Sequence, residues 1–356
     1  MTQRIDSHAA EFHPRRFLAN GHLQTIVGNF LPRPDHLPPG ERYLVEVAPA
    51  EDSRISSQVL CLGHWQPAAD RASCPTAILL HGLEGSSSSQ YVIGNANKLW
   101  RAGCNVVRMN MRNCDGTEPL SPTLYHSGLS ADVLAVLHFF ARSFSLKSIS
   151  LIGYSMGGNL VLKLAGDLGT SAPPPLRSVI GVSPAIDLGL SADALHRPQN
   201  RIYEWRFLRG LLRRYRCKAE LFPLIFDASL AAGIHSIRDF DERIISRYFG
   251  FAGADDYYYR ASAARVLDRI AVPTLILHAL DDPFVRITPE SCRAIEANPH
   301  ITLVETTHGG HCAFLAQPDG DYDGYWAEHT ALRFLLAHAN STPVGVPPLP
   351  YLKQIL

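Results

Sequence analysis

The sequence predicts an α/β fold, a mostly parallel sheet with helices on both faces and a helical insertion. From residue 74 onward, short apolar runs alternate with segments of helical length and spacing. Such runs are typical of buried parallel strands, and repeated βα alternation places helices on both faces of the sheet. The 356 residues, 46% of them hydrophobic, suffice for one large domain with an insertion or for two domains.

The predicted elements follow one another along the chain. Strands are expected at 76–82, 104–112, 148–155, 176–187, 273–282 and 301–311. Helices are expected near 90–102 and at 128–144, 157–169 and 323–338. Between the strand that ends near Asp187 and the strand that begins at Pro273 lie roughly 80 residues too many for one crossover helix. We therefore expect a core formed by 1–186, with an N-terminal extension, and by 263–340, a helical cap at 187–262, and a proline-rich tail at 341–356.

Composition excludes several classes of protein. Lys and Arg together number 33, as do Asp and Glu, so the formal net charge is zero and a nucleic-acid partner is not expected. The seven cysteines are odd in number and form no Cys-x-x-Cys pair, which indicates reduced thiols. The sequence shows neither a secretory signal nor an apolar run of roughly 18 residues that would span a membrane. We expect a cytoplasmic protein.

A serine in the stretch LIGYSMGGNL (151–160) is the candidate nucleophile. Ser155 follows a predicted strand and precedes a predicted helix, and Gly153 and Gly157 allow a tight turn. A serine at such a turn is exposed at the carboxyl edge of the sheet, where α/β sheets bind ligands. The alternative is a serine in an ordinary glycine-rich loop, but the strand before it and the helix after it favour a nucleophile.

A serine nucleophile needs a base, and the base needs an orienting carboxylate. The stretches HALDDPFVR (278–286) and TTHGGHCAFL (306–315) supply both at predicted strand ends. His311 follows a glycine pair and is the predicted base, while His308 is the competing histidine. The spacing His-Gly-Gly-His also suits metal ligands, but no cysteine or carboxylate cluster accompanies it, so no metal is expected.

Two adjacent aspartates compete for the role of the acid. Asp282 precedes Pro-Phe-Val, which fits the usual spacing of such an acid, and Pro283 favours an extended conformation at Asp282. Asp281 would then serve the geometry of the turn. We favour Asp282 and leave Asp281 open.

Developing charge on a carbonyl oxygen must be met by fixed donors. The expected oxyanion donors are two backbone N–H groups, one from the residue after the nucleophile and one from the loop after an earlier strand. They are those of Met156 and Leu83, the latter in the stretch HGLEG.

The predicted cap contains a basic amphipathic segment, RIYEWRFLRGLLRRYRCK (201–218), with Trp205, Leu208, Leu212 and Tyr215 at helical spacing. Such a segment can make weak contact with an anionic membrane surface, but packing of its apolar stripe on the body is the favoured interpretation. An apolar, capped pocket favours an acyl chain as the bound group. Phe222–Phe226 are candidates for its lining or for core between cap and body.

These blocks together resemble the α/β-hydrolase superfamily, and more narrowly its YheT-like branch, also called the AB-hydrolase-4 family. The stretches that carry the resemblance are FLANGHLQTIVGNF (17–30), LLHGLEGSSSSQY (79–91), MNMRNCDGTE (109–118), LYHSGLSAD (124–132), GYSMGGN (153–159), DDYYYRAS (255–262) and ALDDPF (279–284). The resemblance implies an α/β-hydrolase fold and a serine hydrolase without cofactor, with the triad Ser155, Asp282 and His311. It gives Gly21–Thr25, the GHLQT block, no catalytic role, and a structural N-terminal clasp is the favoured interpretation.

The predicted function is hydrolysis of carboxylic esters of acyl chains, acylglycerols or short- to medium-chain esters, by an acyl-enzyme route. Acyl transfer to an alcohol is the alternative, because it shares every step except the second nucleophile. The alternative of another class is a binding protein that has lost the chemistry, which the intact set of serine, aspartate and histidine disfavours.

Overall fold

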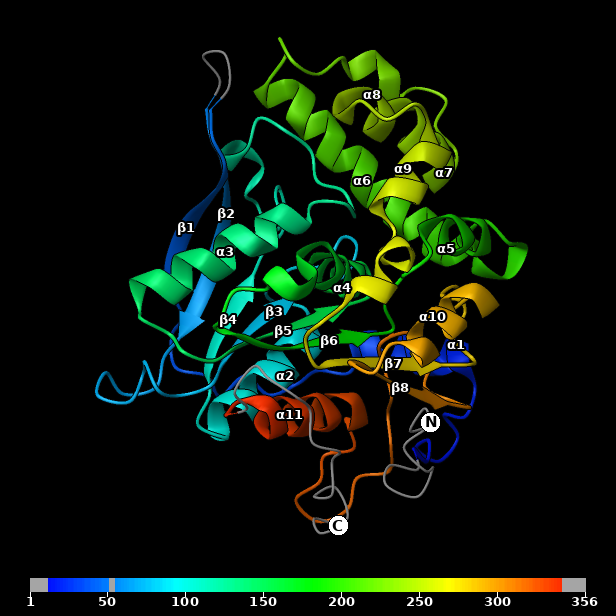
Figure 1. Ribbon diagram of the computed structural model, residues 1–356. Coiled ribbons are helices and arrows are strands. Elements are labelled where there is room, and N and C mark those ends of the chain that lie inside the picture. Colours follow the sequence, from blue (N-terminus) through cyan, green and yellow to red (C-terminus); the bar gives the residue numbers. More distant parts are fainter. Residues whose placement is uncertain (1–11, 51–54, 341–356) are drawn as a thin grey trace.

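The computed structural model describes residues 12–50 and 55–340 of the chain (Figure 1). The predicted tail at 341–356 lies outside the described residues, as does the beginning of the N-terminal extension. The helices of the described part include none that is long and apolar enough to cross a membrane.

An eight-stranded sheet forms the centre of the molecule. Its strands are β1 (Glu41–Ala48), β2 (Ser57–His64), β3 (Thr76–Leu80), β4 (Asn105–Met109), β5 (Ile149–Tyr154), β6 (Leu176–Val182), β7 (Thr274–Ala279) and β8 (Ile301–Thr306). They lie in the order β1-β2-β4-β3-β5-β6-β7-β8, and β2 runs antiparallel to both of its neighbours. All pairs from β4 to β8 are parallel. The predicted α/β fold with a mostly parallel sheet is confirmed.

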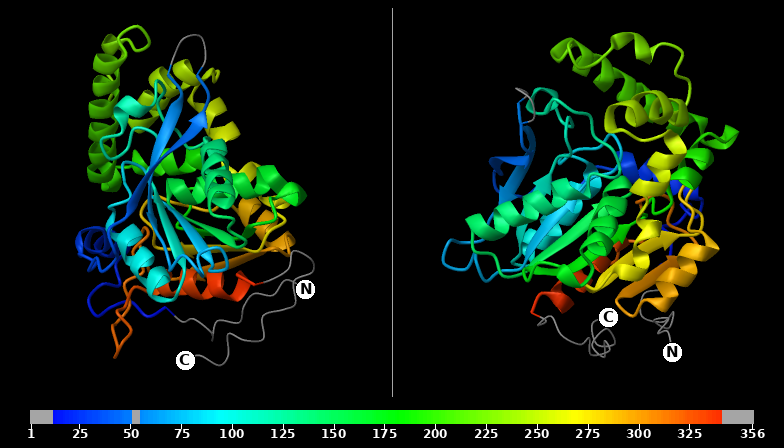
Figure 2. Two further views of the ribbon diagram at one scale, coloured as in Figure 1. Left: turned by 90° about the vertical axis from the view of Figure 1, so that its left-hand side faces the viewer. Right: turned by 45° about the horizontal axis from the view of Figure 1, so that its top comes forward.

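Helices cover both faces of this sheet (Figures 1 and 2). The α-helices are α1 (Gly21–Phe30), α2 (Gln90–Arg101), α3 (Ser130–Ser143), α4 (Met156–Leu168), α5 (Leu188–Leu195), α6 (Arg201–Leu221), α7 (Ile237–Phe240), α8 (Ser246–Phe249), α9 (Ala254–Ala261), α10 (Pro289–Ala297) and α11 (Trp326–His338). Figure 1 shows α2 and α11 on one face and α3 and α4 on the other. Within β3, Ile78 and Leu80 join one buried cluster and Ala77 and Leu79 the other, as alternating side chains must.

Helices α5 to α9 lie together at one end of the molecule (Figure 1). All of them fall between β6 and β7, within the range 187–262 expected for a cap. The exact boundaries of the cap and of the two core segments stay a prediction.

The antiparallel pair of β1 and β2 was not predicted, because it lacks the βα alternation that marks the parallel strands. A signal was present, however. In β1, Tyr43, Val45 and Val47 are buried or half-buried and alternate with exposed Arg42, Leu44 and Glu46, the period of a strand with one covered face.

All six predicted strands end earlier than expected, and the turns after β6 and β7 show why. β6 stops at Val182, where Ser183 takes a positive φ of 44° that ends the extended conformation. β7 stops at Ala279, whose carbonyl accepts a hydrogen bond from the N–H of Asp282 in a turn. Both aspartates at 281 and 282 therefore belong to the loop after β7.

The strand order reverses direction at β3. The chain passes from β3 to β4 on one side and then to β5 on the other side of β3. The connections after β3 and β5 therefore lead in opposite directions along the sheet and leave a crevice at the carboxyl ends of these two strands. Such a crevice is the usual position of a ligand site in open α/β sheets. Leu83 follows β3 and Ser155 follows β5, so the topology brings their loops together.

Candidate active site

Ser155 occupies the sharp turn between β5 and α4 with φ 55° and ψ −116°. A non-glycine residue is strained at such backbone angles, and contacts with its surroundings must offset this strain. Its N–H donates to the Val182 carbonyl at 2.9 Å. A Cβ on Gly157 would lie 2.5 Å from the carbonyl oxygen of His81, and one on Gly153 would collide with the Gly157 carbonyl. The turn can thus be this tight only with glycine at both positions.

Asp282 and His311 form a buried pair. The His311 Nδ1 atom lies 2.7 Å from Asp282 Oδ2. The other carboxylate oxygen, Oδ1, accepts the N–H groups of Phe284 and Val285 at 3.0 and 2.9 Å. Because all these donors face one carboxylate, it orients the imidazole and holds the Nδ1–H tautomer, which leaves Nε2 free to accept a proton.

The competing residues lie elsewhere. Asp281 accepts a hydrogen bond from the N–H of Gly310 at 2.8 Å, and its carboxylate lies 3.6 Å from Nδ1 of His308. The structure therefore pairs Asp282 with His311, whereas Asp281 fixes the loop that carries His311 and approaches His308.

Burial and charge act in opposite directions on the pKa values of this pair. Burial alone lowers the pKa of His311, but the negative charge of Asp282, its hydrogen bond and the interactions with Cys312 together outweigh burial, so the pKa of His311 is raised. Burial raises the pKa of Asp282, but the charge of His311 and the hydrogen bonds to the carboxylate hold that pKa below its ordinary value. The pair therefore favours a carboxylate that stabilises a protonated imidazole.

Ser155 and His311 line one cavity, together with Leu83 and Phe284. The Ser155 hydroxyl and the His311 imidazole, both in the described part of the chain, form no hydrogen bond with each other in this structure. The Phe284 ring packs against the imidazole with 4.3 Å between ring centroids. Catalytic hydrogen bonds often shorten only when substrate is bound, so the geometry is compatible with proton transfer between the two side chains.

The N–H groups of Leu83 and Met156 have no hydrogen-bond acceptor among the described residues. Both residues line the cavity that reaches Ser155. Met156 is the first residue of α4, where backbone N–H groups are unpaired and the helix dipole favours negative charge. The two predicted donors are thus available beside the candidate nucleophile.

Two buried side chains fix the loop that carries Leu83. Burial lowers the pKa of His81 to about 4, so its ring is neutral at physiological pH. Its Nδ1 donates to the Gly82 carbonyl at 2.7 Å, while Nε2 accepts the N–H of Met111 at 3.1 Å. The hydroxyl of Tyr91 accepts the Gly82 N–H at 2.9 Å.

The same loop is tied to helix α6. Arg214 of α6 contacts both carboxylate oxygens of Glu84, at 3.1 and 3.2 Å, and the Tyr125 hydroxyl donates to Glu84 at 2.7 Å. The side chains of Arg214 and Glu84 are only 7% and 11% exposed. A buried pair of this kind joins the cap helix to the loop beside Ser155.

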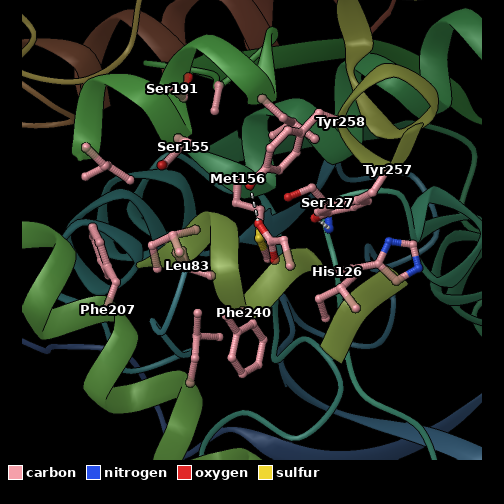
Figure 3. Close-up of a pocket in the computed structure, with 18 of the residues that line it drawn as sticks. Leu83, His126, Ser127, Ser155, Met156, Ser191, Phe207, Phe240, Tyr257 and Tyr258 are labelled. Atoms are coloured by element: carbon pink, nitrogen blue, oxygen red, sulfur yellow. Dashed lines mark hydrogen bonds between the residues drawn. The ribbon is translucent and has the colours of Figure 1, made fainter. Parts of the chain in front are cut away.

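Two cavities meet at Ser155. The inner cavity lies beneath helices of the cap and is drawn in Figure 3. Its apolar lining consists of Leu83, Tyr125, Met156, Ala185, Leu188, Ala192, Leu195, Phe207, Leu211, Ile237, Phe240, Ile245, Phe284 and Val285. The outer cavity also reaches His311 and is bordered by Arg206, Arg209 and Arg213 of α6.

Parts of the cap differ from expectation. Phe222–Phe226 do not line the inner cavity, and Phe226 instead packs on the rings of Tyr215 and Tyr248 within the cap. On α6, Leu208 and Tyr215 are buried as predicted, but Trp205 is 59% exposed and Leu211 is buried in place of Leu212. The buried face of α6 is therefore shifted slightly from the predicted stripe, and it includes Arg214, which binds Glu84. Membrane contact through 201–218 stays a prediction.

Helix α1 contacts both loops of the Asp282–His311 pair. A Cβ on Gly21 would collide with the Asp281 carbonyl, so the helix packs directly on the acid loop. The Thr25 hydroxyl accepts the N–H of His311 at 2.8 Å and donates to the Gly21 carbonyl at 2.7 Å.

A glutamine of the same helix extends this contact. The Gln24 amide donates to the Leu315 carbonyl at 3.1 Å and accepts the Leu315 N–H at 2.8 Å. The GHLQT block therefore holds the backbone on which His311 stands. Sequence reasoning recognised this block but not its contacts, because its partners lie almost 300 residues away in the chain.

Comparison with known proteins gives the family. A family model described as the alpha/beta hydrolase fold matches residues 75–216. A protein of Escherichia coli named putative esterase YheT is 32% identical over 87% of this chain and 88% of its own. The chain belongs to the YheT-like family of α/β hydrolases.

More distant YheT-like relatives carry names of lipid-cleaving enzymes. Phospholipase ABHD3 of Bos taurus is 30% identical over 71% of this chain, and the monoacylglycerol lipase of Saccharomyces cerevisiae is 27% identical over 77%. The matches span 60% and 62% of the lengths of these two relatives. Among solved structures, 2,6-dihydroxy-pseudo-oxynicotine hydrolase aligns with a TM-score of 0.55 at 17% identity, covering 86% of this chain and 71% of its own. That similarity concerns the fold.

Replacing Thr25 tests whether α1 positions His311. Thr25→Val keeps the shape of the side chain but removes the acceptor of the His311 N–H, and a shift of the imidazole by about 1 Å is expected to lower kcat on a short ester roughly a hundredfold. KM should change little, and Thr25→Ser, which keeps the hydroxyl, should retain most of the activity. Equal kcat values for Thr25→Val and the unmodified protein would show that α1 has no such role.

Proposed function

We propose that this α/β hydrolase cleaves carboxylic esters, with Ser155 as nucleophile, His311 as base and Asp282 as the acid that orients it. The observation that carries the proposal is the strained Ser155 turn, which shares a cavity with the Asp282-paired imidazole. Strained backbone conformations of non-glycine residues cluster at active sites, where the surrounding structure holds the reactive side chain in place.

The proposed reaction proceeds through an acyl-enzyme. His311 removes the proton of the Ser155 hydroxyl as the oxygen attacks the ester carbonyl, and Asp282 stabilises the imidazolium that forms. The N–H groups of Leu83 and Met156 receive the negative charge on the carbonyl oxygen. His311 then protonates the leaving alcohol, and water activated by the same imidazole releases the acid.

The apolar lining of the inner cavity supports an acyl chain as the group bound there. Each methylene buried contributes about 0.8 kcal/mol, so side chains such as Phe207, Leu211 and Phe240 favour acyl groups over sugars or charged metabolites. The printed names of the relatives, esterase, phospholipase and monoacylglycerol lipase, agree with esters of lipid type. Acyl transfer to an alcohol uses the same steps until water enters, so product analysis with ethanol present separates the two reactions.

Covalent labelling tests the nucleophile. A fluorophosphonate should add once to the protein, and the adduct should be absent from Ser155→Ala when intact mass is measured. Ser191→Ala is the matched control, because its hydroxyl also lines the inner cavity but donates to the Asp187 carbonyl. An adduct that persists in Ser155→Ala would refute the assignment.

Paired substitutions separate the two aspartates. Asp282→Asn is expected to lower kcat by roughly 10⁴, the loss seen when a triad acid is replaced, because the imidazole adopts the wrong tautomer. Asp281→Asn should lose far less, since it contacts a backbone N–H and not the His311 ring. Thermal unfolding of both variants serves as the control for folding. A larger loss in Asp281→Asn would reverse the assignment.

The pH dependence of kcat/KM should report the His311–Asp282 pair. The base works only as neutral imidazole, so activity should rise as pH rises through the pKa of His311. Because Asp282 raises this pKa, the acidic limb is expected above the value of about 6.5 for an ordinary histidine. In Asp282→Asn, measured with a sensitive fluorogenic ester, the limb should move to lower pH. The same limb in both proteins would contradict the coupling.

A further inference from the structure

One wall of the inner cavity is polar. Ser127, Asp241, Tyr257 and Tyr258 line it, whereas the rest of the cavity is mostly apolar. Figure 3 shows Ser127, Tyr257 and Tyr258 on one side and Leu83 and Phe207 on the opposite side. An apolar acyl chain gives these polar groups nothing to bind.

Asp241 is the unusual member of this polar wall. It begins a π-helical stretch, Asp241–Ile245, a rare conformation that often occurs at functional sites. Asp241 is 8% exposed and lines the cavity. The Tyr258 hydroxyl donates to its Oδ2 at 2.7 Å, while Oδ1 has no hydrogen-bond partner among the described residues.

The two cations nearest in sequence, Arg243 and Arg238, both within the part of the chain that the structure describes, form no ion pair with Asp241. Arg243 instead donates to the Ala232 carbonyl at 2.7 Å. Arg238 forms its ion pairs with Asp193 and Asp255, at 2.8 and 2.5 Å. A buried carboxyl group without a cation costs free energy unless hydrogen bonds satisfy it. The local helix does not use the carboxyl either, because Ser246 Oγ donates to the backbone carbonyl of Asp241. Half of the carboxyl group is therefore left for a ligand.

A second group beside it is also incompletely used. The Tyr257 hydroxyl accepts the N–H of Ser127 at 3.0 Å, and its only other hydrogen-bonding neighbour among the described residues is the small Ser127 side chain. Tyr257 also lines the cavity. The polar wall thus offers Asp241 Oδ1 as one hydrogen-bonding atom and the Tyr257 O–H as another. A ligand hydroxyl, which both donates and accepts, is the group that satisfies such a pair.

We propose that the polar wall binds a hydroxyl group carried by the acyl chain, so that the protein prefers esters of hydroxylated acids over unsubstituted ones. The proposal rests on the proposed function, since it takes the inner cavity as the acyl site. Burial raises the pKa of Asp241 to about 7, although the Tyr258 hydrogen bond acts to lower it. A carboxyl group that is partly protonated near neutral pH is suited to a neutral ligand. A second carboxylate would meet Asp241 with no cation on the wall to balance the charge.

The test compares ethyl esters of hexanoic to decanoic acid with matched esters that carry one hydroxyl at successive positions from C3 outward. The unmodified protein should prefer one hydroxylated position roughly ten- to a hundredfold in kcat/KM, the effect of one hydrogen bond to a buried, partly charged group. Asp241→Leu should reduce this ratio to about one, and Tyr258→Phe, which frees the carboxyl from its orienting partner, should reduce it in part. The ratio cancels any general loss of activity.

Asp255→Asn is the matched control, because Asp255 is an exposed carboxylate of the cap outside the cavity, and it should keep the full ratio. A ratio of one at every position in the unmodified protein would overturn the proposal, as would an unchanged ratio in both Asp241→Leu and Tyr258→Phe. A preference for amino-substituted esters would overturn it in favour of a cation site. Hydrolysis of neither the unsubstituted nor the hydroxylated esters would instead count against the proposed function.

Discussion

The close approach of the β5–α4 turn to the end of β3 is the constraint on which the candidate site depends. Gly157 lies so near the carbonyl oxygens of Leu80 and His81 that no side chain fits between them. This approach forces Ser155 into its strained conformation and at the same time sets the Met156 N–H beside the loop of Leu83. Because β3 lies where the strand order reverses, the candidate nucleophile and both candidate oxyanion donors come from neighbouring strands.

The buried Asp282 carboxylate is the second fixed point. Its two backbone donors and the imidazole replace the water that burial removes, which is the condition for a charged group to remain in the interior. The imidazole in turn depends on a loop in which Gly309 and Gly310 take φ values of +147° and +59°. Glycines adopt such angles freely but do not hold them, so the contacts of Thr25 and Gln24 with this loop replace the rigidity that its sequence lacks.

Local pattern was sufficient to predict the α/β fold and the loops from which the candidate residues come. The strand-turn-helix around Ser155 and the loops after β7 and β8 were readable because chemistry-bearing residues follow apolar runs. The pairing of Asp282 rather than Asp281 with His311 was favoured from spacing, and the 2.7 Å contact agrees with it. Contacts between distant segments could not be predicted, because no local period encodes them: Glu84 with Arg214, Thr25 with His311, and the shift of the buried face of α6 that exposes Trp205.

The Glu84–Arg214 ion pair joins helix α6 to the loop after β3 that carries Leu83. Removing one partner from a buried ion pair typically lowers the free energy of unfolding by about 3–5 kcal/mol, because the other charge is left unpaired. Movement of α6 away from Glu84, without water entering, would separate the same two charges. Access to Ser155 through the outer cavity, which already reaches both Ser155 and His311, therefore requires less free energy than displacement of α6. In this arrangement helices α5, α6, α7 and α9 shape the inner cavity, while the outer cavity leads to Ser155 and His311.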